Sequence, residues 1–194
     1  ERTTETIFKG DLIIAADNVT IDGICLTAKG RIVGSAAGVK NAVITNVFSK
    51  ESTVNGTSSD SATAPICFAT TTADASFENI VINQVKYTGS TGRPMIFYGS
   101  NINGLTITDS EFIAIGVMSN YNDGIKIESI KGNVNITGNY FEQYYQYVIW
   151  FMKYAEGNYK IANNTYKDCG QTAGSHTGAR FATYNGAADG IVNI

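Results

Sequence analysis

The side chains that could do chemistry are few and scattered along the chain. Its 194 residues include one histidine, His176, and neither a GxSxG nor an HExxH motif, so nucleophilic and zinc-dependent mechanisms lack their usual groups. A calcium site needs about six to eight oxygen ligands, which Asp123, Glu128 and Glu111 would supply only if folding happened to bring them together. Arg93 has no carboxylate pair beside it in the sequence. The sequence therefore predicts no catalytic residue, no metal site and no cofactor.

Residues 144–152 are the strongest candidate for a binding site. Alternate side chains of an extended strand point to opposite faces. Both sets of alternate residues in this segment are largely apolar or aromatic, and only one set can line a core, unless a loop or neighbouring coil covers the other. Outward tyrosine and tryptophan rings can stack on sugars or anchor protein interfaces. The predicted binding residues are Tyr144, Tyr145, Tyr147, Trp150 and Phe151.

A short phrase that recurs six times must position these side chains. Each copy has an isoleucine flanked by strand-forming residues, then a polar or glycine turn and usually an aromatic residue. Successive isoleucines are 23 to 38 residues apart, a periodicity typical of solenoids, whose units are stable only when stacked. We expect these isoleucines to point inward along one sheet. They are Ile21, Ile44, Ile82, Ile107, Ile136 and Ile161.

A sharp bend is expected just after the isoleucine of each unit. Asn, Asp and Gly tolerate a left-handed backbone, and Asn46, Asp109, Gly138 and Asn163 each lie two residues after their isoleucine. Five residues after the isoleucine, the copy at Ile44 has Ser49, and the other copies have Leu26, Tyr87, Phe112, Phe141 and Tyr166. Stacking would bring equivalent side chains into register and let asparagine amides hydrogen-bond along a ladder.

A second apolar strand precedes the next isoleucine in most units. These strands are residues 32–33, 65–68, 94–98, 125–127, 148–151 and 181–184. Each unit is therefore expected to turn around a common axis. In this pattern the chain, from about residue 11 to residue 194, resembles the right-handed parallel β-helix family of pectate lyases, polygalacturonases, phage tailspikes and many bacterial surface proteins. The resemblance implies an all-β solenoid of about six to seven coils, forming a single elongated domain over residues 1–194.

Two polar stretches and the last residues depart from the repeat. Residues 51–65 are predicted to form an inserted loop and residues 170–178 a second polar loop. Residues 190–194 resemble residues 104–107 and would begin a further, unfinished coil. Because natural solenoids cap an open core, we expect a segment of a longer protein or a subunit whose end a neighbour covers.

The charge and the apolar runs of the chain argue against some classes of partner, and the cysteines are predicted to be buried. The formal charge is −3, the pI is near 5.1, and Lys and Arg are scattered, which disfavours nucleic acid and anionic membranes. The longest apolar run, residues 147–152, is too short to cross a bilayer. Cys25 and Cys67 lie in apolar strings and are predicted to be buried thiols, with a bridge between coils, including one to Cys169, as the alternative.

Two functions fit these observations. The first is a non-catalytic scaffold of a surface-layer, adhesin or virion-fibre type protein, located outside the cell or on a cell or virion surface. Its partner would be a glycan or a neighbouring subunit, in a homo-oligomer or larger assembly. The alternative is a fragment of a polysaccharide lyase or glycoside hydrolase that acts on acidic glycans and has its acid cluster in coils outside this chain.

The resemblance also tells which motifs an enzyme of this fold would carry. Polygalacturonase-like enzymes have Asn-Thr-Asp, Asp-Asp, Gly-His-Gly and Arg-Ile-Lys, and none of these strings occurs here. Pectate-lyase-like enzymes use clustered aspartates and an arginine base, for which Arg93 is the nearest match, without the aspartates. The sequence therefore favours the scaffold.

Overall fold

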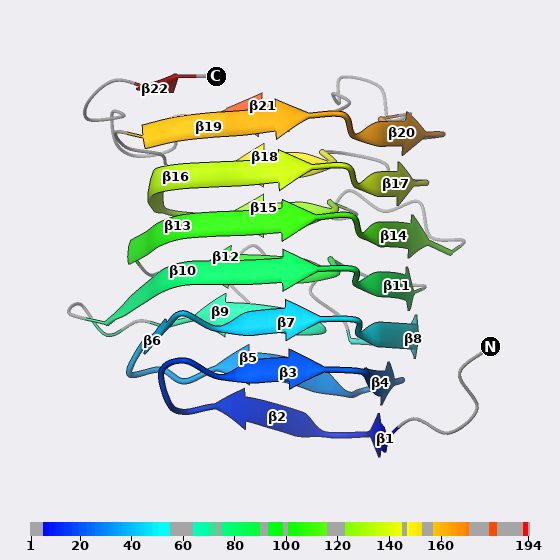
Figure 1. The fold of residues 1–194 in the computed structure, drawn as a ribbon. Helices are drawn as coiled ribbons and strands as arrows, with labels where there is room; N and C mark the ends of the chain where they lie inside the picture. Colours follow the sequence, from blue (N-terminus) through cyan, green and yellow to red (C-terminus); the bar gives the residue numbers. More distant parts are fainter. Residues whose placement is uncertain are drawn as a thin grey trace.

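The computed structural model describes residues 6–54, 64–70, 72, 75–89, 93–98, 101–115, 123–144, 147–152, 157–170, 179–181 and 192–193. In these ranges the chain forms strands and no helix, and the paired strands run parallel in three stacked sheets. Successive coils follow one another from the blue N-terminal end to the red C-terminal end (Figure 1). The fold is all-β and compatible with the parallel β-solenoid that the sequence predicts.

Sheet C carries the repeated isoleucines. Its strands, in spatial order, are β22 (Val192–Asn193), β19 (Gly157–Ala162), β16 (Ile130–Thr137), β13 (Asn101–Thr108), β10 (Ser76–Asn83), β7 (Val43–Thr45) and β3 (Thr20–Asp22), and β6 (Val39–Lys40) also pairs with β10. The register places each repeat isoleucine directly beside the next, from Ile21 to Ile161. Ile21 is 8 % exposed, Ile161 is partly buried against the core, and the four between them are fully buried. The predicted inward ladder is confirmed.

Sheet A follows sheet C around the coil and carries a ladder of rings. Its strands are β1 (Thr6–Phe8), β4 (Ile24–Thr27), β8 (Phe48–Ser52), β11 (Lys86–Gly89), β14 (Glu111–Ala114), β17 (Tyr140–Glu142) and β20 (Thr165–Lys167). Phe141 stacks on Phe112 and on Tyr166, with ring centroids 5.2 and 5.7 Å apart. Ser49 is buried between Leu26 and Tyr87 in the same register. The rings of successive coils therefore form one continuous core.

The bend between sheets C and A uses the residues that the sequence predicts. Asn46, Asp109, Gly138 and Asn163 have φ angles of 57°, 50°, 71° and 56°, all in the left-handed region. A side chain at Gly138 would begin only 2.6 Å from Asp109 Oδ1, so the Asp109 side chain would have to shift to make room for it.

An asparagine ladder also holds this bend together. The Nδ2 atom of buried Asn139 donates to the Ile107 carbonyl at 2.9 Å, and Asn164 Nδ2 donates to the Ile136 carbonyl at 2.8 Å. These amides satisfy backbone carbonyls that a sharp bend leaves without strand partners. The predicted asparagine ladder is thereby confirmed.

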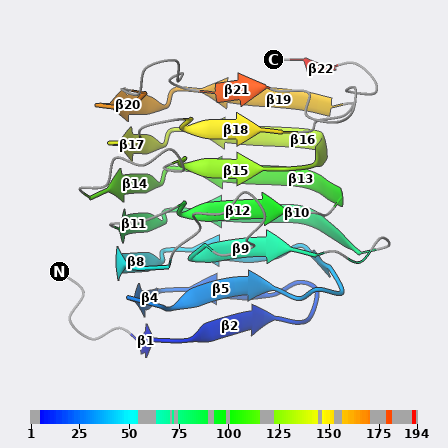
Figure 2. The ribbon, with the colours of Figure 1, turned by 180° about the vertical axis from the view of Figure 1, so that it is seen from behind.

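Sheet B closes the coil. It faces the viewer in Figure 2, in which the molecule is turned by 180° from the view of Figure 1. Its strands are β2 (Asp11–Ile14), β5 (Arg31–Gly34), β9 (Ile66–Ala69), β12 (Met95–Tyr98), β15 (Ile125–Ile127), β18 (Ile149–Phe151) and β21 (Ala179–Phe181). The predicted second strands coincide with five of these, β5 to β18. Phe68 and Phe97 point into the core and stack with centroids 5.7 Å apart.

The predicted departures from the repeat lie largely outside the described ranges. The residues outside the described ranges include 55–63 of the inserted loop, 171–178 of the polar loop, and 190–191 and 194 of the last coil. The loop begins later than predicted, because Glu51 and Ser52 still belong to β8. Val192 and Asn193 pair with β19 as one more parallel strand of sheet C.

Candidate functional site

The outward face of sheet B gathers the chemistry-bearing side chains of the aromatic segment. In β18, Ile149 and Phe151 are fully buried in the core, so Trp150 between them faces outward. The register places Trp150 beside Lys126 of β15, and Lys126 beside Ile96 of β12. Adjacent parallel strands lie about 4.8 Å apart, so these side chains are immediate neighbours.

Lys126 is held between two aromatic rings. Its Nζ atom lies 5.7 Å from the centre of the Tyr98 ring and 5.5 Å from the centre of the Trp150 ring, and the side chain is fully buried. A cation over an aromatic face is attracted by about 0.5–1 kcal/mol at an exposed site and by about 2 kcal/mol when desolvated. The ammonium therefore fixes both rings and makes them a rigid, partly exposed platform.

Tyr147 supports this platform from the preceding bend. Its ring centroid is 5.3 Å from that of Trp150, and its side chain is 8 % exposed. The Tyr147 amide donates to Asp123 Oδ1 at 3.3 Å, and Asp123 Oδ2 accepts from Arg93 Nε at 2.8 Å. We define the platform surface as Tyr98, Lys126, Tyr147 and Trp150, of which Tyr98 and Trp150 are partly exposed and the other two are buried beneath them. A buried ion pair thus anchors one edge of it.

The Arg93–Asp123 ion pair is buried and has a structural role. Arg93 is 1 % exposed and Asp123 is fully buried. Burial raises the pKa of Asp123, and the charge and hydrogen bond of Arg93 oppose that shift. An arginine that abstracts a proton must reach its substrate, and this one lies inside the protein. The sequence shows no carboxylate pair beside Arg93, and the fold brings one carboxylate, that of Asp123, to it from the next coil.

The aromatic segment is not one continuous strand, which changes the predicted site. Strand β18 covers only Ile149–Phe151, and the chain bends before it. Tyr144 and Phe151 are both fully buried core residues, although alternation along a single strand would put them on opposite faces. Tyr144 packs edge-on against Phe141, with centroids 6.2 Å apart. These two predictions are corrected; Tyr145 lies outside the described residues, and Tyr147 and Trp150 come together as stated above.

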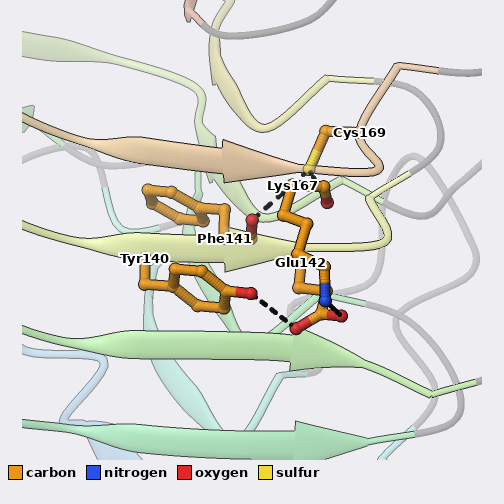
Figure 3. A network of polar contacts seen from close by, with 5 residues as sticks. All are labelled: Tyr140, Phe141, Glu142, Lys167 and Cys169. Atoms are coloured by element: carbon orange, nitrogen blue, oxygen red, sulfur yellow. Dashed lines mark hydrogen bonds and ion pairs between the residues drawn. The ribbon is translucent and has the colours of Figure 1, made fainter.

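A second polar group lies on the outward face of sheet A (Figure 3). The Tyr140 hydroxyl donates to Glu142 Oε2 at 2.7 Å, and Lys167 Nζ donates to Glu142 Oε1 at 2.8 Å. These bonds, the one from Lys167 first, lower the pKa of Glu142, and the bond to Glu142 raises the pKa of Tyr140. Both shifts move away from neutrality, so the group is unsuited to proton transfer and instead ties β17 to β20.

Cys25 and Cys67 are buried on the outer faces of their sheets, whereas Cys169 is partly buried against the core. Cys67 is 1 % exposed and Cys25 is 9 % exposed, and none of Cys25, Cys67 and Cys169 forms a disulfide. Burial raises the pKa of Cys67 to about 11, which makes it an unreactive thiol. The predicted burial of Cys25 and Cys67 is confirmed, and the alternative of a bridge between coils is not observed.

The part of the chain that the structure describes contains neither a cluster of metal-binding side chains nor a membrane-spanning helix. No group of three or more His, Cys, Asp or Glu side chains there could hold a metal ion. Glu111 instead pairs with Lys86 at 3.0 Å, while Asp123 pairs with Arg93. No helix in these ranges is long and apolar enough to cross a membrane.

Comparison with known proteins gives no relative for this chain: no family model, curated protein or solved structure matches it. Function must therefore be inferred from the chain's own geometry. Sequence reasoning missed Tyr98 and Lys126 as members of the platform surface. The signal was present in the repeat, because aligning residues 94–98, 125–127 and 148–151 puts Lys126 beside Trp150.

Proposed function

We propose that the chain is a non-catalytic scaffold, a right-handed parallel β-helix of about six to seven coils in an extracellular, cell-surface or virion-fibre protein. The observation that supports this most is the pairing of equivalent residues in successive coils: the repeat isoleucines pair from coil to coil along sheet C, and aromatic rings pair along sheet A. Stacked parallel coils satisfy each other's backbone and bury a continuous core, which gives a stiff rod. Rods of this kind hold binding surfaces at a fixed distance and angle.

The contact of this rod is the platform surface, which meets a glycan or a neighbouring subunit. Its rings are held in place before binding by Lys126 and by the Arg93–Asp123 pair, so little side-chain entropy is lost on association. Aromatic rings with fixed orientation suit both the C–H faces of sugars and apolar residues of a partner.

Trp150 makes this proposal directly testable, because it is the single tryptophan of the chain. The purified protein would be applied to a glycan array, and its self-association measured by analytical ultracentrifugation. Binding to a glycan or to a second copy should change the fluorescence of Trp150. Trp150→Ala should weaken that binding, measured on the array or by ultracentrifugation, by about fivefold or more. The matched control is Ile13→Ser, since Ile13 is 61 % exposed on the same sheet but lies at its first strand.

Two results would count against the contact surface. One is a wild-type protein that stays monomeric and binds no arrayed glycan; the other is an equal loss of binding in Trp150→Ala and Ile13→Ser. For the alternative of a lyase or hydrolase fragment, incubation with polygalacturonate and other acidic glycans, with and without calcium, is the test. We expect no cleavage, and unsaturated or reducing-end products would favour the enzyme.

A further inference from the structure

A groove lies at the carboxyl ends of the sheet A strands, on a different sheet from the platform surface. Its volume is about 540 Å³, within the range of sites for small ligands. Strands β4, β8 and β14 bring its walls together from three coils. The lining residues are Thr27, Ala28, Lys50, Glu51, Thr53 and Ile115.

The walls of this groove are fixed by bonds between neighbouring coils. The amide and the hydroxyl of Thr53 lie 2.8 and 3.4 Å from the Ala28 carbonyl, to which both donate. The Glu51 amide donates to Thr88 Oγ1 at 3.0 Å, and the Ile115 amide donates to the Gly89 carbonyl at 2.7 Å. The backbone that frames the groove is therefore fixed before a ligand binds, and only the exposed side chains would have to be ordered.

The lining combines donors, acceptors and one apolar surface. Among the residues that the structure describes, neither the Lys50 ammonium nor the Glu51 carboxylate has an ion-pair partner, although Lys40, Lys86 and Lys167 all do. Opposite charges in one groove cancel and give no preference for a charged ligand. Ile115 is 48 % exposed and gives the groove its apolar surface.

We propose that this groove binds a neutral pyranose unit of a glycan. A sugar hydroxyl both donates and accepts, so adjacent hydroxyls can donate to the Glu51 carboxylate and accept from the Lys50 ammonium. The hydroxyls of Thr27 and Thr53 provide further donors and acceptors. The C–H face of the ring would cover Ile115 and remove its exposed apolar surface from water. The inference is independent of the platform surface and of its partner.

The test is an NMR titration of the isotopically labelled protein with the methyl pyranosides of glucose, galactose and mannose. At least one probe should shift the amide signals of residues 50–53 and 115. Lys50→Ala, Glu51→Gln and Ile115→Ser should each weaken binding, by about tenfold for the two charged residues. Lys9→Ala and Ile13→Ser are the matched controls, because Lys9 and Ile13 are exposed and lie outside the groove.

The outcomes separate this inference from the proposed function. Absence of any shift with all three probes, or equal weakening in the control variants, would overturn the groove. Shifts confined to Trp150 and its neighbours would support the platform surface and overturn the groove. Shifts at the groove that survive Trp150→Ala would support the groove whatever the platform surface binds.

Discussion

The buried pair of Arg93 and Asp123 gives the sharpest prediction about what stabilises this coil. Arg93→Met leaves a fully buried carboxylate, and Asp123→Asn leaves a buried guanidinium. At the observed separation of 2.8 Å the attraction is about 6 kcal/mol for an effective dielectric constant of about 20, largely offset by desolvation of both charges. Removing one partner forfeits the attraction but keeps the desolvation cost of the other, so each variant should lose about 3–5 kcal/mol of unfolding free energy.

The double variant Arg93→Met with Asp123→Asn separates charge from packing. Asparagine keeps an oxygen to accept the Tyr147 amide, and neither charge of the pair remains. Urea unfolding should therefore show a double variant more stable than the sum of the single losses predicts, by about 2 kcal/mol or more. Additive losses, or a loss below about 1 kcal/mol for Arg93→Met, would refute this account of the pair.

Three further predictions concern the core and the surface. Ile107→Ala should lower the unfolding free energy by about 2–5 kcal/mol in urea unfolding, since Ile107 is fully buried in the isoleucine ladder, and a loss below about 1 kcal/mol would contradict it. Tyr159→Phe should lower the unfolding free energy by about 1 kcal/mol, because the Tyr159 hydroxyl donates to the Ile130 carbonyl. Tyr144→Phe should be neutral or stabilising in the same assay, because the buried Tyr144 hydroxyl has no hydrogen-bond partner among the described residues. A larger loss for Tyr144→Phe than for Tyr159→Phe would refute this. Lys167→Met should raise the pKa of Glu142 in an NMR titration. It should also abolish the stability that the lowered pKa of Glu142 contributes, which is present above the unfolded pKa and lost as pH falls through the folded pKa. An unchanged pKa of Glu142 would show that the ion pair with Lys167 does not cause its lowered value.

The repeat isoleucines and the bend residues could be predicted from the sequence because they obey short-range rules. Alternation puts Ile107 and Ile136 on one face, and asparagine, aspartate and glycine tolerate the left-handed backbone that the bend after each isoleucine needs. Stacking then repeats one local solution, so a correct reading of a single coil extends to the others. The three-sheet arrangement follows from the same repetition.

The candidate site depended on contacts between coils, which no local rule contains. The alternation rule failed for Tyr144 because the chain bends before β18, and a bend changes which face the next residue takes. Lys126 and Trp150 are 24 residues apart in the sequence, and Arg93 and Asp123 are 30 residues apart. Each pair comes together only because successive coils stack in register. The sequence by itself determined the repeating coil and its core, because period and turn chemistry are local. Which outward side chains meet, and therefore what the surface can bind, was decided by the register between coils, because it places side chains that are far apart in the sequence beside one another.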